Sequence, residues 1–299
     1  MIRRLVDGLI YRFYRLLRRW RAFHRRYLDR TRPVDRPAQP SLYMLRLPTA
    51  GRPARFALER PGHIEDRLVE KGSYEPYITS LCLFFMKEDG LFVDIGANFG
   101  LHALQIAAAL PRARCLCFEP HPAVHQELRR NIRFSGFDNV AAHPIALGEA
   151  AGTVDFFMHE LGAYNKGLSS LHPTPDMEGG FRREKVEMTT LDAFLPEADR
   201  DRLSVVKIDV QGAERRVLAG MKEILARARP AVVFEFESEY VKDPEAEIRA
   251  ILEGFPDHHV FRIREGHPEL TAFDPAAVRA QGYWANLVAL PKDGWWKAK

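Results

Sequence analysis

Short apolar runs alternate with stretches of helical spacing along most of the chain. Runs typical of buried strands lie at residues 91–95, 114–119, 139–147, 153–158, 205–208 and 230–235. Helical patterns follow at 102–110, at 123–133 and from Ala213 onward. Two late runs, 257–266 and 283–290, can close the sheet as a hairpin. This order predicts an α/β fold with a doubly wound, mostly parallel sheet and an antiparallel C-terminal hairpin.

Residues 1–30 have the pattern of a basic amphipathic helix, because apolar side chains recur every three or four positions between arginines. No apolar stretch there approaches the roughly 20 residues that span a bilayer. Three interpretations stay open: peripheral membrane contact, packing on its own domain or a second subunit, and a transit peptide, which the lack of Ser disfavours. The prolines of 32–40 predict a linker. We therefore divide the chain into 1–40, helix and linker, and 41–299, the α/β domain.

Charge is unevenly distributed along the 299 residues, whose formal net charge is +4. Eleven arginines and two aspartates between Met1 and Pro33 give that segment +9, so the remainder carries −5. A nucleic-acid enzyme more often spreads basic residues over its substrate face, and no NPPY or DPPY tetrapeptide of nucleobase methylation occurs. We therefore expect no nucleic-acid partner.

Cysteine and histidine positions give little sign of a metal or disulfide framework. The chain has three cysteines, and Cys115 and Cys117 lie two apart in an apolar run, where we expect buried side chains on one strand face. His258 and His259 are adjacent, so in a strand they face opposite sides, and we expect both at the surface. No metal site is predicted from them.

The strongest chemical signal is a strand, a glycine turn and a helix at 91–110. Asp94 lies near the end of the strand, and Gly96-Ala97-Asn98-Phe99-Gly100 forms the turn. This is half of a nucleotide-binding βαβ unit. Asn98 breaks the GxGxxG fingerprint of nicotinamide enzymes, and no GK[ST] of a phosphate loop follows. An acidic residue beside the turn suits a ligand that carries an amino group, such as S-adenosylmethionine.

Acidic residues also end the later strands. Glu119, followed by Pro120, lies 23 positions after Gly96, where a carboxylate can accept both hydroxyls of a ribose. Asp209 and Glu235 end the strands at 205–208 and 230–235. Carboxyl ends of parallel strands meet at one edge of the sheet, so we expect Asp94 and these side chains on a common rim.

The chain resembles the FkbM family of class I methyltransferases over roughly 70–290. The matching segments are VDIGANFG (93–100), FEPHP (118–122), IALGEAAG (145–152), GLSSL (167–171), TTLD (189–192), VKIDVQGAE (206–214) and NLVA (286–289). The resemblance implies transfer of a methyl group from S-adenosylmethionine to an oxygen of a sugar, glycolipid or secondary metabolite. The cofactor-binding residues so expected are Asp94, Gly96, Ala97, Asn98, Gly100, Glu119, Pro120 and Ala146. The family commonly has Glu where this chain has Gln211, so a role that needs charge there is in doubt.

A hydroxyl acceptor needs a base or a metal to take its proton. The catalytic candidates are Asp209, Glu214 and Glu235, with His121 as a further base; Asp209 is favoured because it ends the strand opposite the cofactor turn. Asp209 with Glu235 could instead hold a divalent cation, though two carboxylates are too few to predict one. Lys207 is expected to be a salt-bridge partner, and the Gly162–Gly180 loop is either a disordered insert or a substrate lid.

Two other functions remain open at this stage. One is a methyltransferase fold that serves as a scaffold without catalysis, and the other is a nicotinamide oxidoreductase, which Asn98 disfavours. The expected partner is a small-molecule or glycan acceptor, the oligomeric state is not predicted, and the expected location is cytoplasmic, with the option of peripheral contact at the inner face of the membrane through residues 1–30.

Overall fold

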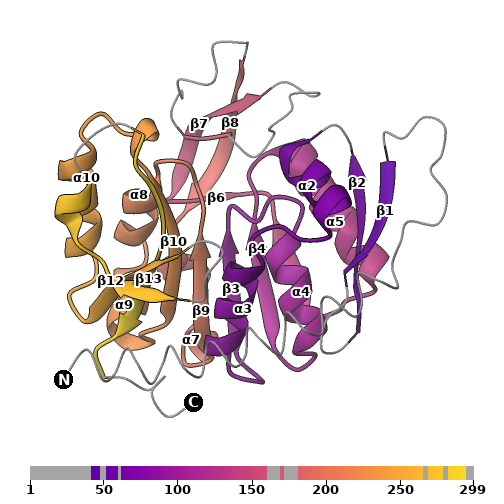
Figure 1. Cartoon of the computed structure of the whole chain (residues 1–299), viewed down its shortest axis with the longest axis horizontal. Helices are drawn as coiled ribbons and strands as arrows, with labels where there is room; N and C mark the ends of the chain where they lie inside the picture. Colours follow the sequence, from indigo (N-terminus) through magenta and orange to yellow (C-terminus); the bar gives the residue numbers. More distant parts are fainter. Residues whose placement is uncertain are drawn as a thin grey trace.

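The computed structural model describes residues 42–47, 52–59, 62–159, 169–171, 181–264, 269–278 and 282–293. Its main element is an eight-stranded sheet with the order β12-β11-β13-β10-β9-β3-β4-β5 (Figure 1). The strands are β3 (Leu91–Ile95), β4 (Arg114–Phe118), β5 (Val140–His143), β9 (Leu203–Ile208), β10 (Ala231–Glu237), β11 (His258–Ile263), β12 (Leu270–Ala272) and β13 (Trp284–Pro291). Strands β5, β4, β3, β9 and β10 run parallel, which confirms the predicted doubly wound sheet.

Helices cover both faces of this sheet, as expected for parallel strands that are apolar on both sides. The core of one face contains residues of α3 (Pro76–Phe85), α4 (Leu101–Ala109) and α5 (Pro122–Ser135). The core of the other face contains residues of α6 (Leu191–Phe194), α8 (Glu214–Ala219), α9 (Lys222–Arg227) and α10 (Pro244–Glu253), while α7 (Glu197–Arg200) lies in the connection to β9. Within the described residues, no helix combines the length and apolarity needed to cross a membrane.

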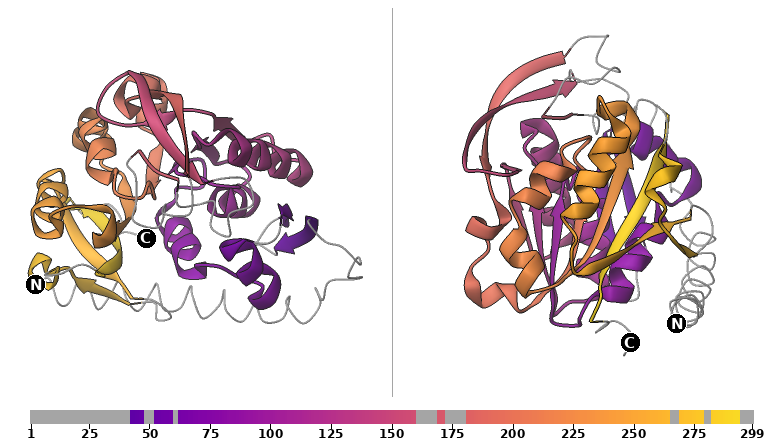
Figure 2. Two further views of the ribbon diagram at one scale, coloured as in Figure 1. Left: turned by 90° about the horizontal axis from the view of Figure 1, so that it is seen from above. Right: turned by 90° about the vertical axis from the view of Figure 1, so that its left-hand side faces the viewer.

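Two smaller sheets and one further helix flank the main sheet. β1 (Leu42–Leu47) pairs with β2 (Ala54–Glu59), and α2 (His63–Lys71) follows them in the chain. β6 (Ala146–Leu147), β8 (Phe181–Thr189) and β7 (Gly152–His159) form a three-stranded sheet. Figure 2 shows the β7–β8 ribbon extending away from the main sheet.

The C-terminal strands are antiparallel as predicted, but they do not form a simple hairpin. β13 lies between β10 and β11 and is antiparallel to both. β12 and the 3₁₀ turn η4 (Pro275–Ala277) intervene in sequence between β11 and β13. The predicted strand at 139–147 is also divided, because β5 belongs to the main sheet whereas β6 belongs to the small one.

Several local predictions can be compared with the structure directly. Cys115 and Cys117 are buried in the core of the α4 face, as expected. His259 is exposed, but the surface prediction is wrong for His258, which is buried and has its Nε2 3.1 Å from the carbonyl oxygen of Pro230. The predicted N-terminal helix and linker, and most of the Gly162–Gly180 loop, lie outside the described residues.

The chain passes from β3 outward to β4 and β5, and then returns to β9 on the other side of β3. The order of the parallel strands therefore reverses between β3 and β9. In open α/β sheets, ligands bind beyond the carboxyl ends of the strands at such a switch point. The fold thus places the predicted turn 96–100 and Asp209 at the expected binding edge.

Candidate active site

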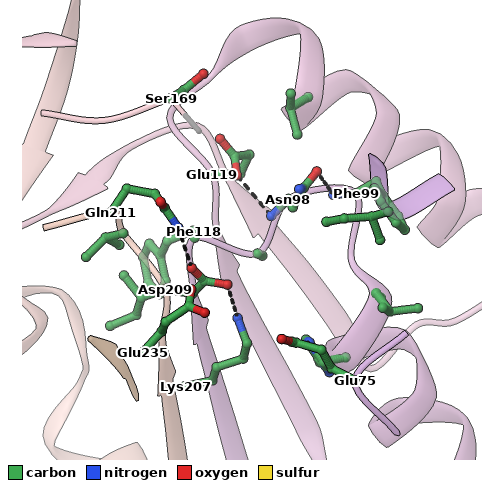
Figure 3. A pocket seen from close by; sticks show the side chains of 18 of the residues that line it. Glu75, Asn98, Phe99, Phe118, Glu119, Ser169, Lys207, Asp209, Gln211 and Glu235 are labelled. Atoms are coloured by element: carbon green, nitrogen blue, oxygen red, sulfur yellow. Dashed lines mark hydrogen bonds and ion pairs between the residues drawn. The ribbon is translucent and has the colours of Figure 1, made fainter. Parts of the chain in front are cut away.

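A cavity of about 630 Å³ lies at the switch point, lined by residues from many parts of the chain (Figure 3). The turn after β3, the ends of β4, β9 and β10, and the strand β6 form its inner wall. Six residues predicted to bind a cofactor line it together, namely Gly96, Ala97, Asn98, Glu119, Pro120 and Ala146. Asp209 and Glu235 line the same space. Of the strand-end acids expected on a common rim, Glu119, Asp209 and Glu235 line this cavity, whereas Asp94 does not.

Glu119 is held in place by the backbone on both sides of it. Its Oε2 accepts a hydrogen bond from the main-chain N–H of Asn98 at 2.9 Å, and its Oε1 accepts one from that of His121, also at 2.9 Å. Burial raises the pKa of Glu119 to about 7, although the two N–H donors act in the opposite direction. Each carboxylate oxygen retains a lone pair that a hydroxyl can use.

Of the two glycines predicted to bind the cofactor, Gly96 lines the cavity and Gly100 does not. Gly96 has φ 76°, and a Cβ there would lie 1.9 Å from the carbonyl oxygen of Asp209. Gly100 has φ 92°, and a Cβ there would lie 2.6 Å from Cδ1 of Leu128. Both positions favour glycine because their φ is positive, and at Gly96 the main chain of Asp209 also leaves no room for a side chain.

Asp94 lies behind the cavity wall. It is 0% exposed, and its Oδ1 is 3.9 Å from Nζ of Lys207, its register partner on β9. Burial raises the pKa of Asp94, and Lys207 offsets part of that increase. The structure therefore gives Asp94 the position of a countercharge for Lys207. The direct contact with a ligand amine expected from the sequence is not supported by this geometry.

Lys207 joins Asp94 to Asp209. Its Nζ is 3.0 Å from Oδ2 of Asp209, so the predicted salt bridge is present, with the side chain of Lys207 only 6% exposed. Burial alone would lower the pKa of Lys207, but the two aspartates raise it above its ordinary value. Burial would likewise raise the pKa of Asp209, yet Lys207 keeps it below its ordinary value. Asp209 is therefore an ionised carboxylate at neutral pH.

Glu235 sits beside Asp209 and differs from it in protonation. Burial, followed by the charge of Asp209, raises the pKa of Glu235 well above its ordinary value. Its Oε1 accepts a hydrogen bond from Nε1 of Trp284, and its carboxyl group hydrogen bonds to Asp209. Asp209 also accepts a hydrogen bond from Nε2 of Gln211 at 3.2 Å. The pair thus consists of a neutral acid next to a carboxylate that is 31% exposed.

Backbone strain is concentrated around this cavity. Four residues other than glycine have positive φ, and three of them line it: Glu75 (41°), Asn98 (51°) and Gln211 (52°). A residue held in the left-handed region costs roughly 1–3 kcal/mol and is typical of functional sites. The three come from separate connections in the fold, before α3, after β3 and after β9. Their convergence supports a functional cavity independently of sequence motifs.

Two of the predicted catalytic candidates lie elsewhere among the described residues. Glu214 is 4% exposed and does not line the cavity; its Oε1 accepts a hydrogen bond from the main-chain N–H of Gly212 at the start of α8. Burial raises its pKa to about 7. His121 is the N-cap of α5, where its Nδ1 accepts from the N–H of Ala123, and it does not line the cavity either. Both positions have a structural explanation.

The outer wall of the cavity was not predicted from the sequence. It comes from α2 and the segment leading to α3, with His63, Arg67, Lys71, Tyr74 and Glu75 among its lining residues. The signal available in the sequence was a spacing of four between His63, Arg67 and Lys71, which puts them on one helix face. Ser169 and Leu171 of the GLSSL segment also line the cavity, and the hydroxyl of Ser170 donates to the carbonyl oxygen of Gln211 at 2.8 Å.

The sequence profile of the methyltransferase FkbM domain matches residues 94–263, more than half of the chain. This chain belongs to the FkbM methyltransferase family. The matched range begins within β3, ends with β11, and contains Glu119, Asp209 and Glu235, whereas α2 precedes it.

Individual methyltransferases are similar to part of this chain. The 2-O-methyltransferase NoeI of Sinorhizobium fredii is 28% identical over 186 residues, 57% of this chain and 72% of NoeI. The hexuronic acid methyltransferase AglP of Haloferax volcanii is 27% identical over 165 residues, 53% of this chain and 61% of AglP. The crystal structure of methyltransferase FkbM from Methylobacillus flagellatus is 16% identical, with a TM-score of 0.46, over 76% of this chain and 52% of that one.

The described residues around this cavity do not form a metal-binding cluster. In the described part of the chain, no group of three or more His, Cys, Asp and Glu side chains is arranged to hold a metal ion. Asp209 and Glu235 are adjacent, but Lys207 and Trp284 already contact them.

Proposed function

We propose that this protein uses S-adenosylmethionine to methylate a hydroxyl group of a sugar-containing acceptor. The observation that carries the proposal is the meeting of two walls in one cavity. One wall has the turn 96–98 and Glu119, and the other has the ionised Asp209 beside the neutral Glu235. A cofactor wall and a carboxylate base that face one space suit a methyl transfer to oxygen.

The inner wall fits the cofactor by the chemistry of its donors and acceptors. Glu119 offers one free lone pair on each oxygen, which suits the two adjacent hydroxyls of a ribose. Pro120, Ile145 and Ala146 supply apolar surface for a base beside it. Asp94 acts behind this wall by holding Lys207, and Gly96 and Gly100 allow the turn to pack closely. The cofactor, when bound, supplies an electrophilic methyl group on a sulfonium.

Asp209 is the general base in this proposal. Its carboxylate is ionised and partly exposed, so it can take the proton of an acceptor hydroxyl as the new bond between oxygen and methyl forms. Lys207 and Gln211 fix the orientation of its two oxygens. Glu235 hydrogen bonds to Asp209 and is itself oriented by Trp284, so it helps to hold the Asp209 carboxylate in place. Positioning of acceptor and methyl supplies several kcal/mol of the acceleration.

The choice of oxygen and of a sugar is supported by the names of two relatives. One is a 2-O-methyltransferase and the other a hexuronic acid methyltransferase. The acid pair of this cavity agrees with an acceptor that must lose a proton. A glycolipid or a hydroxylated secondary metabolite presents the same hydroxyl chemistry and belongs in the same search.

The test combines calorimetric titration of S-adenosylhomocysteine with transfer of labelled methyl groups to a panel of saccharides and glycolipids. We expect micromolar binding by the wild type, a loss of about tenfold or more in Glu119→Ala, and unchanged binding in Glu214→Gln, a matched carboxylate off the cavity. Asp209→Asn should lower turnover by about 10²–10⁴ while it retains the cofactor.

Two results would contradict the proposal. If the folded wild type does not bind the cofactor product, the protein is a scaffold with a methyltransferase fold. If Asp209→Asn retains full turnover, Asp209 is not the base and the acid pair has another role.

A further inference from the structure

The cavity face of α2 is a row of basic side chains. His63, Arg67 and Lys71 are spaced by four, so they lie on one side of the helix, and all three line the cavity. With a rise of about 1.5 Å per residue, the row extends about 12 Å along the wall. The opposite, inward side of α2 is anchored by the buried Leu68. We call His63, Arg67 and Lys71 the α2 basic row.

The two longest members of this row are available for a ligand. Arg67 and Lys71 are both exposed, and neither forms an ion pair with any carboxylate in the part of the chain that the structure describes. Most other cavity-lining charges are satisfied internally, as Lys207 is by Asp209 and Glu75 is by His102 at 3.6 Å. Arg67 and Lys71 therefore direct positive charge to the cavity without an ion-pair partner among the described carboxylates, whereas burial lowers the pKa of His63, which adds no fixed charge.

The cavity is consequently divided by charge. Asp209, Glu235 and Glu237 line the side formed by β9 and β10, where Lys207 is paired with Asp209. The α2 basic row lines the other side, where the acidic Glu75 contacts His102. Tyr74 lies between the two sides. Its ring packs edge-on against His63 with centroids 6.3 Å apart. Burial raises the pKa of its hydroxyl, nearby acids including Asp209 raise it further, and Arg67 lowers it. A ligand that spans the cavity meets cations at one end and the acid pair at the other.

We propose that the α2 basic row selects acceptors that carry an anionic group, a carboxylate, phosphate or sulfate on the glycan, and orients the reacting hydroxyl toward Asp209. This inference rests on the proposed function. An anionic group on the acceptor is attracted to Arg67 and Lys71 and repelled by Asp209. The acceptor is therefore favoured in the orientation that places its anionic group at α2 and disfavoured in the reverse one. Arginine suits such a group because its guanidinium can bind carboxylate or phosphate oxygens in a bidentate manner.

The carboxylate of the cofactor is the other anion that could occupy this row. Two features favour the acceptor. Arg67 and Lys71, about 6 Å apart along the helix axis, offer two positive charges, whereas one amino-acid carboxylate carries a single negative charge. In addition, α2 lies outside the range matched by the FkbM domain, whereas the turn, Glu119 and Asp209 lie inside it. An element outside the shared domain is a suitable place for residues that recognise the acceptor, because acceptors differ between relatives whereas the cofactor does not. The experiment below distinguishes the acceptor anion from the cofactor carboxylate.

The experiment uses the full chain saturated with S-adenosylhomocysteine on a glycan array. The array pairs glucuronate-, phosphate- and sulfate-bearing oligosaccharides with their neutral counterparts. We compare the wild type with Arg67→Gln/Lys71→Gln, and use Arg133→Gln, an exposed arginine of α5 off the cavity, as the control for loss of positive charge. S-adenosylhomocysteine affinity is measured separately for each protein by calorimetry.

The expected result is a preference of the wild type for acidic members, lowered about tenfold or more in the double variant and unchanged in the control. Affinity for S-adenosylhomocysteine should stay within about twofold in all three proteins. The inference is overturned if no acidic member is preferred, or if the double variant retains the preference. It is also overturned if the double variant loses S-adenosylhomocysteine, because the row then holds the cofactor carboxylate. Failure of the wild type to bind S-adenosylhomocysteine instead refutes the proposed function itself.

Discussion

Gly96 packs so closely against Asp209 that a Cβ on Gly96 would lie 1.9 Å from the main-chain carbonyl oxygen of Asp209. The contact is reinforced one residue earlier, where the N–H of Asp209 donates to the carbonyl oxygen of Ile95 at 3.0 Å. The turn assigned to the cofactor and the residue assigned to proton transfer are therefore fixed to one another by the backbone. A substitution that moves the backbone at Gly96 is therefore expected to move Asp209 as well, whether or not a ligand is bound.

Gly96→Ala is expected to destabilise the protein by roughly 3 kcal/mol or more, because a methyl group clashes with backbone and the residue has φ 76°. Gly136→Ala is the matched control, since Gly136 has φ 68° but nothing within 4 Å of the added carbon. It should cost only about 1–2 kcal/mol, the penalty for the left-handed conformation. Denaturant unfolding of both variants measures the difference, and equal losses would show that the Asp209 contact yields easily.

Lys207→Met should lower the free energy of unfolding by about 3–5 kcal/mol at neutral pH, because it leaves Asp94 and Asp209 without their countercharge. Adding Asp94→Asn should recover part of that loss, since one buried negative charge is then removed. The comparison is made by denaturant unfolding of the single and double variants. A single variant within 1 kcal/mol of the wild type would refute the buried triad of charges.

S-adenosylhomocysteine should bind more tightly as pH rises through about 7. The pKa of Glu119 is raised to about 7 by burial, and hydroxyl donors favour its ionised form, so binding is weakened below that pH. Titrations between about pH 5.5 and 8.5 measure the slope. Glu119→Gln should bind more weakly and lose most of the pH dependence. A wild-type affinity that does not change over this range would contradict a contact between Glu119 and the ligand.

Glu214→Gln should stabilise the protein relative to wild type above pH 7, by roughly 3 kcal/mol at most. The pKa of Glu214 is raised in the fold to about 7, so its contribution to stability is fully present below the unfolded value near 4.5 and is lost as pH rises through 7. The amide can still accept from the N–H of Gly212. Unfolding at about pH 4 and pH 8 should reveal a gain only at the higher pH.

The inner wall could be predicted because its residues follow directly from strand ends. An apolar run that stops at Asp209 or Glu119 places that side chain at the edge of a parallel sheet, whatever the rest of the fold does. Glu235 follows the same rule. Sequence position does not reveal side-chain direction, however. Asp94 proved to lie behind the wall, because it shares a strand face with the apolar Phe92 and is paired in register with Lys207.

Glu214 and the α2 wall show where local patterns stop being informative. Glu214 follows Asp209 by five residues, but the turn through Gln211 and Gly212, both with positive φ, turns its carboxylate back to the start of α8. The helix α2 precedes β3 by some twenty residues, and only the folded chain brings its row of cations over the switch point. No local rule connects those two segments.

The position of α2 has a consequence for how such an enzyme can change over generations. Its cavity-facing Arg67 and Lys71 are exposed, and exchanging exposed side chains usually alters stability by no more than about 0.5 kcal/mol. By contrast, Asp94, Lys207 and Gly96 are locked into buried charge pairs or backbone contacts that tolerate little variation. Substitutions at the exposed α2 positions therefore cost little stability, whereas substitutions at the buried positions cost much more. Under the proposed function, acceptor specificity can change over generations without altering the buried residues of the site.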